Sequence, residues 1–160
     1  MAFIRIKKIS GNPYAYLVQN KWTEKGSRQG KSEYLGRVAQ YEDSKEVTYD
    51  HIHELGTYKK MCKELILLEL RKKGFAKEGK WHVKDAIRVD LPKVLAKGNN
   101  SVIESGEGFI CEYSYKKLLG FKAKEERFEV ALAKTVLESG IAMPPESFVY
   151  IYEAVKRETK

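Results

Sequence analysis

Cysteine is the first residue that this sequence has little of. Its two cysteines, Cys62 and Cys111, lie 49 positions apart in 160 residues, with no Cys-x-x-Cys or Cys/His spacing around them. A disulfide-stapled fold and a structural zinc site therefore have no support, and we expect no metal and no cofactor. Both thiols lie in apolar contexts, which favours buried, reduced cysteines. A disulfide between them is the minor alternative.

Long hydrophobic runs are also missing. No apolar stretch reaches the roughly 18 residues that a membrane-spanning helix needs, because Glu69 interrupts the longest one, residues 65–70. The first eight residues alternate and carry charge too early for a secretory signal. These features predict a cytoplasmic protein without a membrane association.

Asparagine and glutamine are scarce, at four and three, whereas the charged residues are mostly lysine and glutamate, at 23 and 18. This bias is typical of heat-adapted proteins. Hydrophobic residues make up 42% of the chain, which argues against disorder. The length fits one domain, or a small domain with an appendage, that buries a real core.

Positive charge is present and is unevenly distributed. Residues 1–40 hold eight Lys or Arg and two Glu, a net charge of +6, which leaves only +2 of the chain's +8 for residues 41–160. The same segment carries aromatic residues at strand-like spacing, namely Phe3, Tyr14, Tyr16, Trp22 and Tyr34. Clustered cations among aromatic rings are typical of surfaces that bind a polyanion, because cations release its counterions and rings stack on its bases.

The pattern of apolar residues predicts an α+β fold with two regions. Residues 1–40 read as a basic, three-stranded antiparallel meander over 3–9, 14–22 and 32–38, with a polar loop at 24–31. Residues 41–160 read as an α+β body. A long central helix over 51–73, with Asp50 as its N-cap, is expected to pack on one face of the meander. Which face it covers is left open by the alternation.

The rest of the body predicts shorter elements. Residues 86–91 alternate like a strand, and residues 102–111 form a second hairpin around Ser-Gly-Glu-Gly. Residues 113–119 favour a short helix. Helical patterns over 125–139 and from Pro144 onwards, with a short connection, predict a C-terminal antiparallel helix pair.

The motifs that suggest catalysis fail on spacing. Residues 26–32, GSRQGKS, have three residues between their glycines where a phosphate-binding loop needs four, and a strand follows instead of a helix. His51 and His53 lack the further ligands of a zinc site. Gly106 and Gly108 read as a hairpin turn. We therefore expect no catalytic residues and no enzyme activity.

Three segments of the front of the chain carry a family resemblance. They are residues 6–18 (IKKISGNPYAYLV), 26–31 (GSRQGK) and 33–38 (EYLGRV). Together they resemble the start of some insertion-sequence transposases of the DDE class, in which KxxGxxYxYLV leads into RQ and then YLGR. The resemblance covers about 38 of the 160 residues and implies a small β unit in proteins that handle DNA. It does not extend to the catalytic domain of that family. Residues 80–158 resemble uncharacterised archaeal proteins.

We therefore predict a non-catalytic nucleic-acid-binding protein that uses its N-terminal sheet and the 23–31 loop. DNA, RNA and a ribonucleoprotein are all open as the target, and so is the oligomeric state. The alternative is an adaptor whose basic front docks an acidic protein partner. The predicted phosphate contacts are Arg5, Lys7, Lys8, Lys25, Arg28, Lys31 and Arg37, and the predicted stacking residues are Tyr16 and Trp22.

Overall fold

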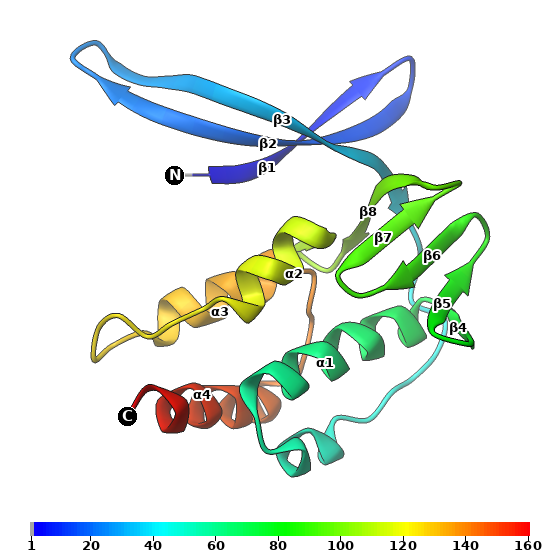
Figure 1. The fold of residues 1–160 in the computed structure, drawn as a ribbon, viewed down its shortest axis with the longest axis vertical. Coiled ribbons are helices and arrows are strands. Elements are labelled where there is room, and N and C mark those ends of the chain that lie inside the picture. Colours follow the sequence, from blue (N-terminus) through cyan, green and yellow to red (C-terminus); the bar gives the residue numbers. More distant parts are fainter. Residues whose placement is uncertain (1) are drawn as a thin grey trace.

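The structure is a computed structural model that describes residues 2–160. These residues form an α+β fold of nine strands in one mixed sheet, four α-helices and one 3₁₀ helix, η1 (Figure 1). The elements are β1 (Ala2–Ile9), β2 (Asn12–Thr23), β3 (Gly26–Gln40), η1 (Asp50–Leu55), α1 (Tyr58–Lys72), β4 (Ala76–Glu78), β5 (Trp81–Lys84), β6 (Ile87–Asp90), β7 (Lys93–Ala96), β8 (Asn99–Ser105), β9 (Gly108–Ile110), α2 (Glu112–Leu119), α3 (Glu129–Glu138) and α4 (Pro145–Thr159).

Strands β1, β2 and β3 pair antiparallel in chain order. Ser10 and Gly11 both have positive φ, which is the geometry of the two-residue turn that matches the twist of a hairpin. Strands β2 and β3 are longer than β1, whose first described residue, Ala2, pairs with Gln19. Beyond that pair, residues 20–31 form a two-stranded arm that projects from the molecule (Figure 1). Residues 2–40 are called the front below, and residues 41–160 the body.

The prediction of a separate three-stranded sheet is wrong. The end of β3 pairs with a strand of the body: residues 37–40 run parallel to residues 101–104 of β8. The other end of β8 pairs with β7, and β7, β6, β5 and β4 follow in an antiparallel meander. The predicted hairpin at 102–111 is present as β8 and β9, but it belongs to this same sheet. One sheet therefore connects the front to the body.

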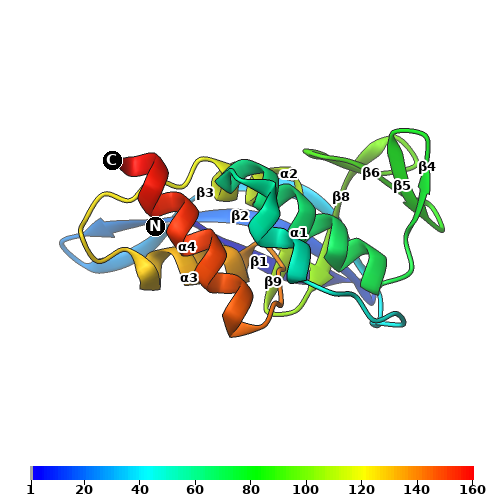
Figure 2. The ribbon, with the colours of Figure 1, turned by 90° about the horizontal axis from the view of Figure 1, so that it is seen from below.

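The helices lie on one side of the front (Figures 1 and 2). Strands alternate their side chains between two faces, and the inner face of the front carries Ile4, Ile6, Ala15 and Val38. These residues pack against a second group made up of Val102, Phe109, Cys111 and Tyr113, which belong to β8, β9 and the start of α2. The expected packing of the front on the central helix is therefore wrong.

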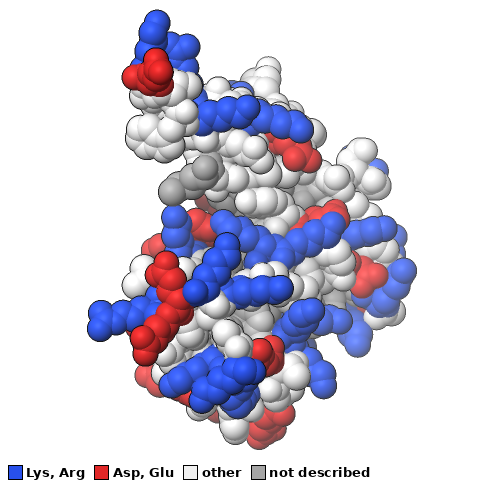
Figure 3. Space-filling model, turned by 60° about the vertical axis from the view of Figure 1, so that its left-hand side comes forward, with Lys and Arg blue, Asp and Glu red and all other residues white. Residues whose placement is uncertain are grey.

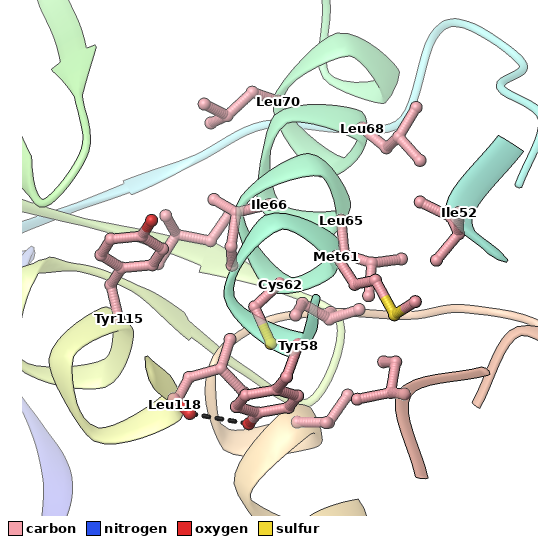
Figure 4. Packing of buried hydrophobic residues seen from close by; sticks show 14 of the residues in the cluster. Ile52, Tyr58, Met61, Cys62, Leu65, Ile66, Leu68, Leu70, Tyr115 and Leu118 are labelled. Carbon is pink, nitrogen blue, oxygen red and sulfur yellow. Dashed lines mark hydrogen bonds between the residues drawn. The ribbon is translucent and has the colours of Figure 1, made fainter. Parts of the chain in front are cut away.

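The main core surrounds α1 (Figure 4). Met61, Cys62, Leu65 and Ile66 are buried on this helix, and Tyr58 donates a hydrogen bond from its hydroxyl to the Leu118 carbonyl at 2.7 Å. Burying each such aliphatic side chain stabilises the fold by roughly 1.5–3 kcal/mol, so this cluster is the main source of stability in the body.

The predicted long helix over 51–73 is interrupted. Asp50–Leu55 forms η1, Gly56 with φ of 82° breaks the chain direction, and α1 is only 15 residues long. The N-cap of α1 is Thr57, whose hydroxyl accepts from the Lys60 amide at 3.4 Å, and not Asp50. The sequence pattern missed the break because the apolar stripe continues across it from Ile52 and Leu55.

The predicted C-terminal helix pair is also wrong. Helix α3 begins at Glu129 rather than at Glu125. Helix α4 is hydrogen-bonded to the start of α1. Glu158 accepts the Tyr58 amide at 2.8 Å, and Arg157 donates to the Gly56 carbonyl at 3.1 Å. The short connection between α3 and α4 therefore does not define a hairpin of helices. Within residues 2–160, no helix combines the length and the apolarity needed to cross a bilayer.

Candidate nucleic-acid interface

The outer face of the front gathers aromatic and basic side chains because of one irregularity in β3. Tyr16 pairs with Tyr34 and Tyr14 pairs with Arg37, so two residues of β3, Leu35 and Gly36, lie opposite the single residue Ala15. This is a β-bulge. It places Tyr34 and Arg37, which are three positions apart, on the same face.

Gly36 is required for this bulge. Its φ is +140°, and a Cβ atom added there would overlap the Asn100 carbonyl oxygen of the neighbouring strand β8. A side chain therefore does not fit between β3 and β8. The Tyr34-Leu-Gly-Arg37 segment thus has a structural reason for its glycine, independent of any family resemblance.

Three tyrosines form a cluster on the outer face. The ring centre of Tyr34 lies 5.4 Å from that of Tyr16 and 6.3 Å from that of Tyr14. The Lys7 ammonium lies 4.7 Å from the Tyr16 ring centre, a cation–π contact that covers this ring. Arg37 donates to the Asn12 side-chain oxygen at 2.8 Å. Tyr34 is 55% exposed, so its ring is the one most accessible to a ligand.

Partial burial raises the pKa of the Tyr34 hydroxyl, and the neighbouring Tyr14 and Tyr16 raise it further, while Arg37 lowers it. The hydroxyl therefore stays protonated and neutral at physiological pH. A neutral ring beside cations does not repel phosphate groups, and its hydroxyl remains a hydrogen-bond donor.

The cations of the front form no ion pair with an acidic residue in the part of the chain that the structure describes. All ten ion pairs within residues 2–160 join groups of the body, and none includes any of the eight Lys or Arg residues of the front. Figure 3 shows the basic tip of the arm standing clear of a body surface on which basic and acidic side chains are interspersed. The front therefore presents charge that the protein does not neutralise itself.

The arm carries the most exposed aromatic residue of the described chain. Trp22 is 85% exposed and lies directly opposite Ser27, while Lys21 lies opposite Arg28 on the other face of the two-stranded ribbon. The turn is closed by Thr23, whose hydroxyl donates to the Gly26 carbonyl at 2.9 Å. The prediction of a polar loop at 24–31 is wrong, since residues 26–31 belong to β3 and only Glu24 and Lys25 form the turn.

A cleft of about 780 Å³ lies beside the tyrosine cluster, where the sheet bends from β3 towards β7. Tyr14, Tyr34 and Arg37 line its front side. Its body side is lined by the turn before β6, with Asp85, and by residues around the turn between β7 and β8, Lys97, Asn99 and Asn100.

The predicted site residues fall into three groups in the structure. Arg5, Lys7, Tyr16 and Arg37 lie on the outer face, by their pairing across β1 to β3. Trp22, Lys25, Arg28 and Lys31 lie on the arm. Lys8 pairs with Pro13 and shares the opposite face with Ile4 and Ile6, so the structure does not bring it to the other cations.

Sequence reasoning left Tyr14 and Tyr34 out of the site, although their spacing within the strands was visible. Asn99, Asn100 and Lys97 had no local signal, because only the pairing of β3 with β8 brings them to the tyrosines.

The two cysteines are buried. Burial raises the pKa of the Cys62 thiol to about 12 and also raises that of Cys111, so neither is a ready nucleophile. Across residues 2–160, no three His, Cys, Asp or Glu side chains gather as metal ligands.

Comparisons of the chain with family models, with curated proteins and with solved structures give no match.

Proposed function

We propose that this protein is a non-catalytic nucleic-acid-binding protein whose interface is the outer face of the front together with the arm. The observation that carries the proposal is the set of cations in residues 2–40, which have no acidic partner among the described residues and lie among exposed aromatic rings. When unpaired Lys and Arg side chains bind a phosphate backbone, they release its counterions, and this release makes binding favourable.

The aromatic residues favour nucleic acid over the alternative, an acidic protein partner. A surface that only attracts acidic side chains needs cations, whereas Tyr34 and Trp22 expose large ring faces that have no partner among the described residues of the fold beyond the tyrosine cluster. Stacking of bases on such rings contributes about 1–3 kcal/mol for each base.

The test is a salt titration of binding. Fluorescence anisotropy of labelled single-stranded DNA, RNA and duplex DNA would be measured from about 50 to about 200 mM salt, where a phosphate-binding surface of several cations loses at least about tenfold in affinity. Replacing two arm cations, Arg28→Glu with Lys31→Glu, is expected to weaken binding at low salt by at least about tenfold, because two phosphate contacts become repulsive.

The matched control is Lys122→Glu with Lys124→Glu. These exposed lysines lie between α2 and α3, and the substitution changes the net charge by the same amount. The proposal expects the control to bind almost as well as the unaltered protein. Equal weakening in both variants would mean that only the net charge matters, and it would overturn the assignment of the interface to the arm. No binding to any probe at low salt would favour the acidic-partner alternative.

A further inference from the structure

The cleft beside β3 has the features of a site for a single planar group. Its volume of about 780 Å³ lies within the range of about 300–1,000 Å³ that is usual for ligand pockets. One side presents the Tyr34 ring, and the other side presents the amide of Asn99, which is exposed and shares the face of Arg37 by the pairing of β3 with β8. A ring for stacking and amides for hydrogen bonding are the groups that recognise a nucleobase.

The amide of Asn99 is available for such contacts. Among the side-chain hydrogen bonds within residues 2–160, none uses this amide. An amide carries both an acceptor and two donors, so it pairs with the edge of any base. Arg37 and Lys97 lie at the same cleft and supply positive charge for the phosphates that flank the base.

We propose that this cleft binds an unpaired nucleobase, so that the protein recognises single-stranded rather than double-stranded nucleic acid. The inference rests on the proposed function, since it names the class of nucleic acid that the same interface binds. Tyr34 stacks on the base, Asn99 contacts its edge, and Arg37 and Lys97 hold the adjacent phosphates.

The reason for a single strand is the availability of base faces. Within a duplex the neighbouring bases cover both faces of every base. A ring such as Tyr34 therefore cannot stack on a base unless that base is turned out of the helix. A single strand offers unstacked bases that aromatic side chains of a sheet can receive. The rival geometry is the arm lying in the major groove of a duplex, which is wide enough for a two-stranded ribbon. That geometry leaves the cleft and the tyrosine cluster without a role.

The test compares probes that share phosphate charge but differ in their bases. Oligonucleotides of about 15 residues, close to the site size of sheet-based binders, would be used as thymidine DNA, uridine RNA, a duplex and an abasic DNA strand. We expect the thymidine or the uridine strand to bind at least about tenfold tighter than the abasic strand and the duplex at equal salt, and either result supports the proposal. The uridine strand separates an RNA preference from a DNA preference.

Variants of the cleft give the second comparison. Tyr34→Ala and Asn99→Ala are each expected to weaken binding of the base-containing single strand by about five- to tenfold and to leave the abasic strand unchanged, because they remove base contacts. Tyr34→Leu, which keeps side-chain bulk without a ring, is expected to behave as Tyr34→Ala does. Tyr150→Ala, on α4, is the control and is expected to bind as the unaltered protein does. Urea unfolding of each variant verifies that it is folded.

The outcomes separate the two proposals. Equal affinity for abasic and base-containing strands, or a preference for duplex that Tyr34→Ala does not alter, overturns the nucleobase cleft while the phosphate-binding front stands. Absence of binding to all four probes at low salt overturns the proposed function itself.

Discussion

The front and the body of this molecule use charge in opposite ways. In the body, Glu69 is 1% exposed and is held by the Lys72 ammonium at 2.8 Å and the Ala142 amide at 3.0 Å, while buried Lys73 contacts Asp43 at 2.9 Å. In the front, eight cations face solvent without an ion pair among the described residues. Charge that is paired inside a protein serves its structure, whereas unpaired surface charge is available to a ligand.

The hydrophobic interior follows the same division. The large cluster around α1 belongs to the body, whereas the inner face of the front contributes a smaller cluster centred on Ala15 and Val38. The outer part of the arm has no buried residue between Gln19 and Leu35. The front therefore depends on the body for its stability and is free to present its other face to a ligand.

The largest expected effect is a loss of stability at the buried carboxylate. Glu69→Ala is expected to lower the free energy of unfolding by about 3–5 kcal/mol, because it leaves Lys72 and Lys73 without their buried partner. The matched change in the front, Glu33→Ala, removes an exposed carboxylate and is expected to alter stability by less than about 0.5 kcal/mol. Urea unfolding would compare them. Equal losses of stability in the two variants would contradict the conclusion that only the charges of the body serve the structure.

The next effect tests the junction between the two regions. Gly36→Ala is expected to lower the free energy of unfolding by more than about 2 kcal/mol, because its Cβ would collide with the Asn100 carbonyl. Gly11→Ala is the control, since Gly11 also has a positive φ, 79°, but has nothing within 4 Å of the added Cβ. It is expected to cost about 1 kcal/mol. A Gly36→Ala protein no less stable than the control would contradict the close approach of β3 and β8.

A smaller effect separates binding from stability within the front. Trp22→Ala is expected to change the free energy of unfolding by less than about 0.5 kcal/mol, because the side chain is 85% exposed. The same change is expected to weaken binding of single-stranded DNA by about fivefold or more, since a stacking ring is lost. Anisotropy and urea unfolding on one protein sample would give both numbers. A stability loss without a binding loss would assign Trp22 to the fold instead of the interface.

The smallest effect concerns acid stability. Burial lowers the pKa of His82 on β5, and Arg71, Lys77 and Lys63 lower it further. The unfolded chain therefore binds a proton more tightly at this site, with a pKa near the usual value of about 6.5, so this contribution to stability is present above that pH and is lost as the pH falls towards the lower folded value.

His82→Gln is accordingly expected to reduce the fall in stability between about pH 8 and about pH 5.5, as measured by urea unfolding at each pH. The front contains no histidine, so this dependence belongs to the body. An identical pH profile for the variant and the unaltered protein would contradict this assignment.

The local pattern of apolar residues is sufficient to predict the strands of the front, but it does not predict how the elements are arranged. Alternation predicts strands at 3–9, 14–22 and 32–38, although it does not decide which face is buried, and β1 to β3 include all three segments. The parallel pairing of β3 with β8 joins residues 64 positions apart and leaves no local trace. The α1 stripe likewise gave no sign of the break at Gly56, because apolar spacing continued through it.

The candidate site shows the same limit. The distribution of charge along the sequence indicates the front as the interface, but it does not show on which face of the sheet each cation lies. Lys7 lies over Tyr16 on the outer face, whereas Lys8 lies on the inner face. Charge counting also gave no reason to include Tyr34. Tyr34 shares a face with Arg37 only because of the bulge, which depends on the pairing of β3 with β2 and on the space that Gly36 leaves beside β8. Asn99 and Asn100 became visible only when the sheet brought them to the cleft.

The most direct test of the central claim is to map binding onto the chain by nuclear magnetic resonance. Backbone amide signals of the labelled protein would be recorded as a thymidine oligonucleotide of about 15 residues is added. The shifted signals are expected to belong to the outer face of the front, to the arm and to residues 97–101 at the cleft, while those of α3 and α4 are unchanged. Shifts confined to α3 and α4, or no shifts at low salt, would contradict it.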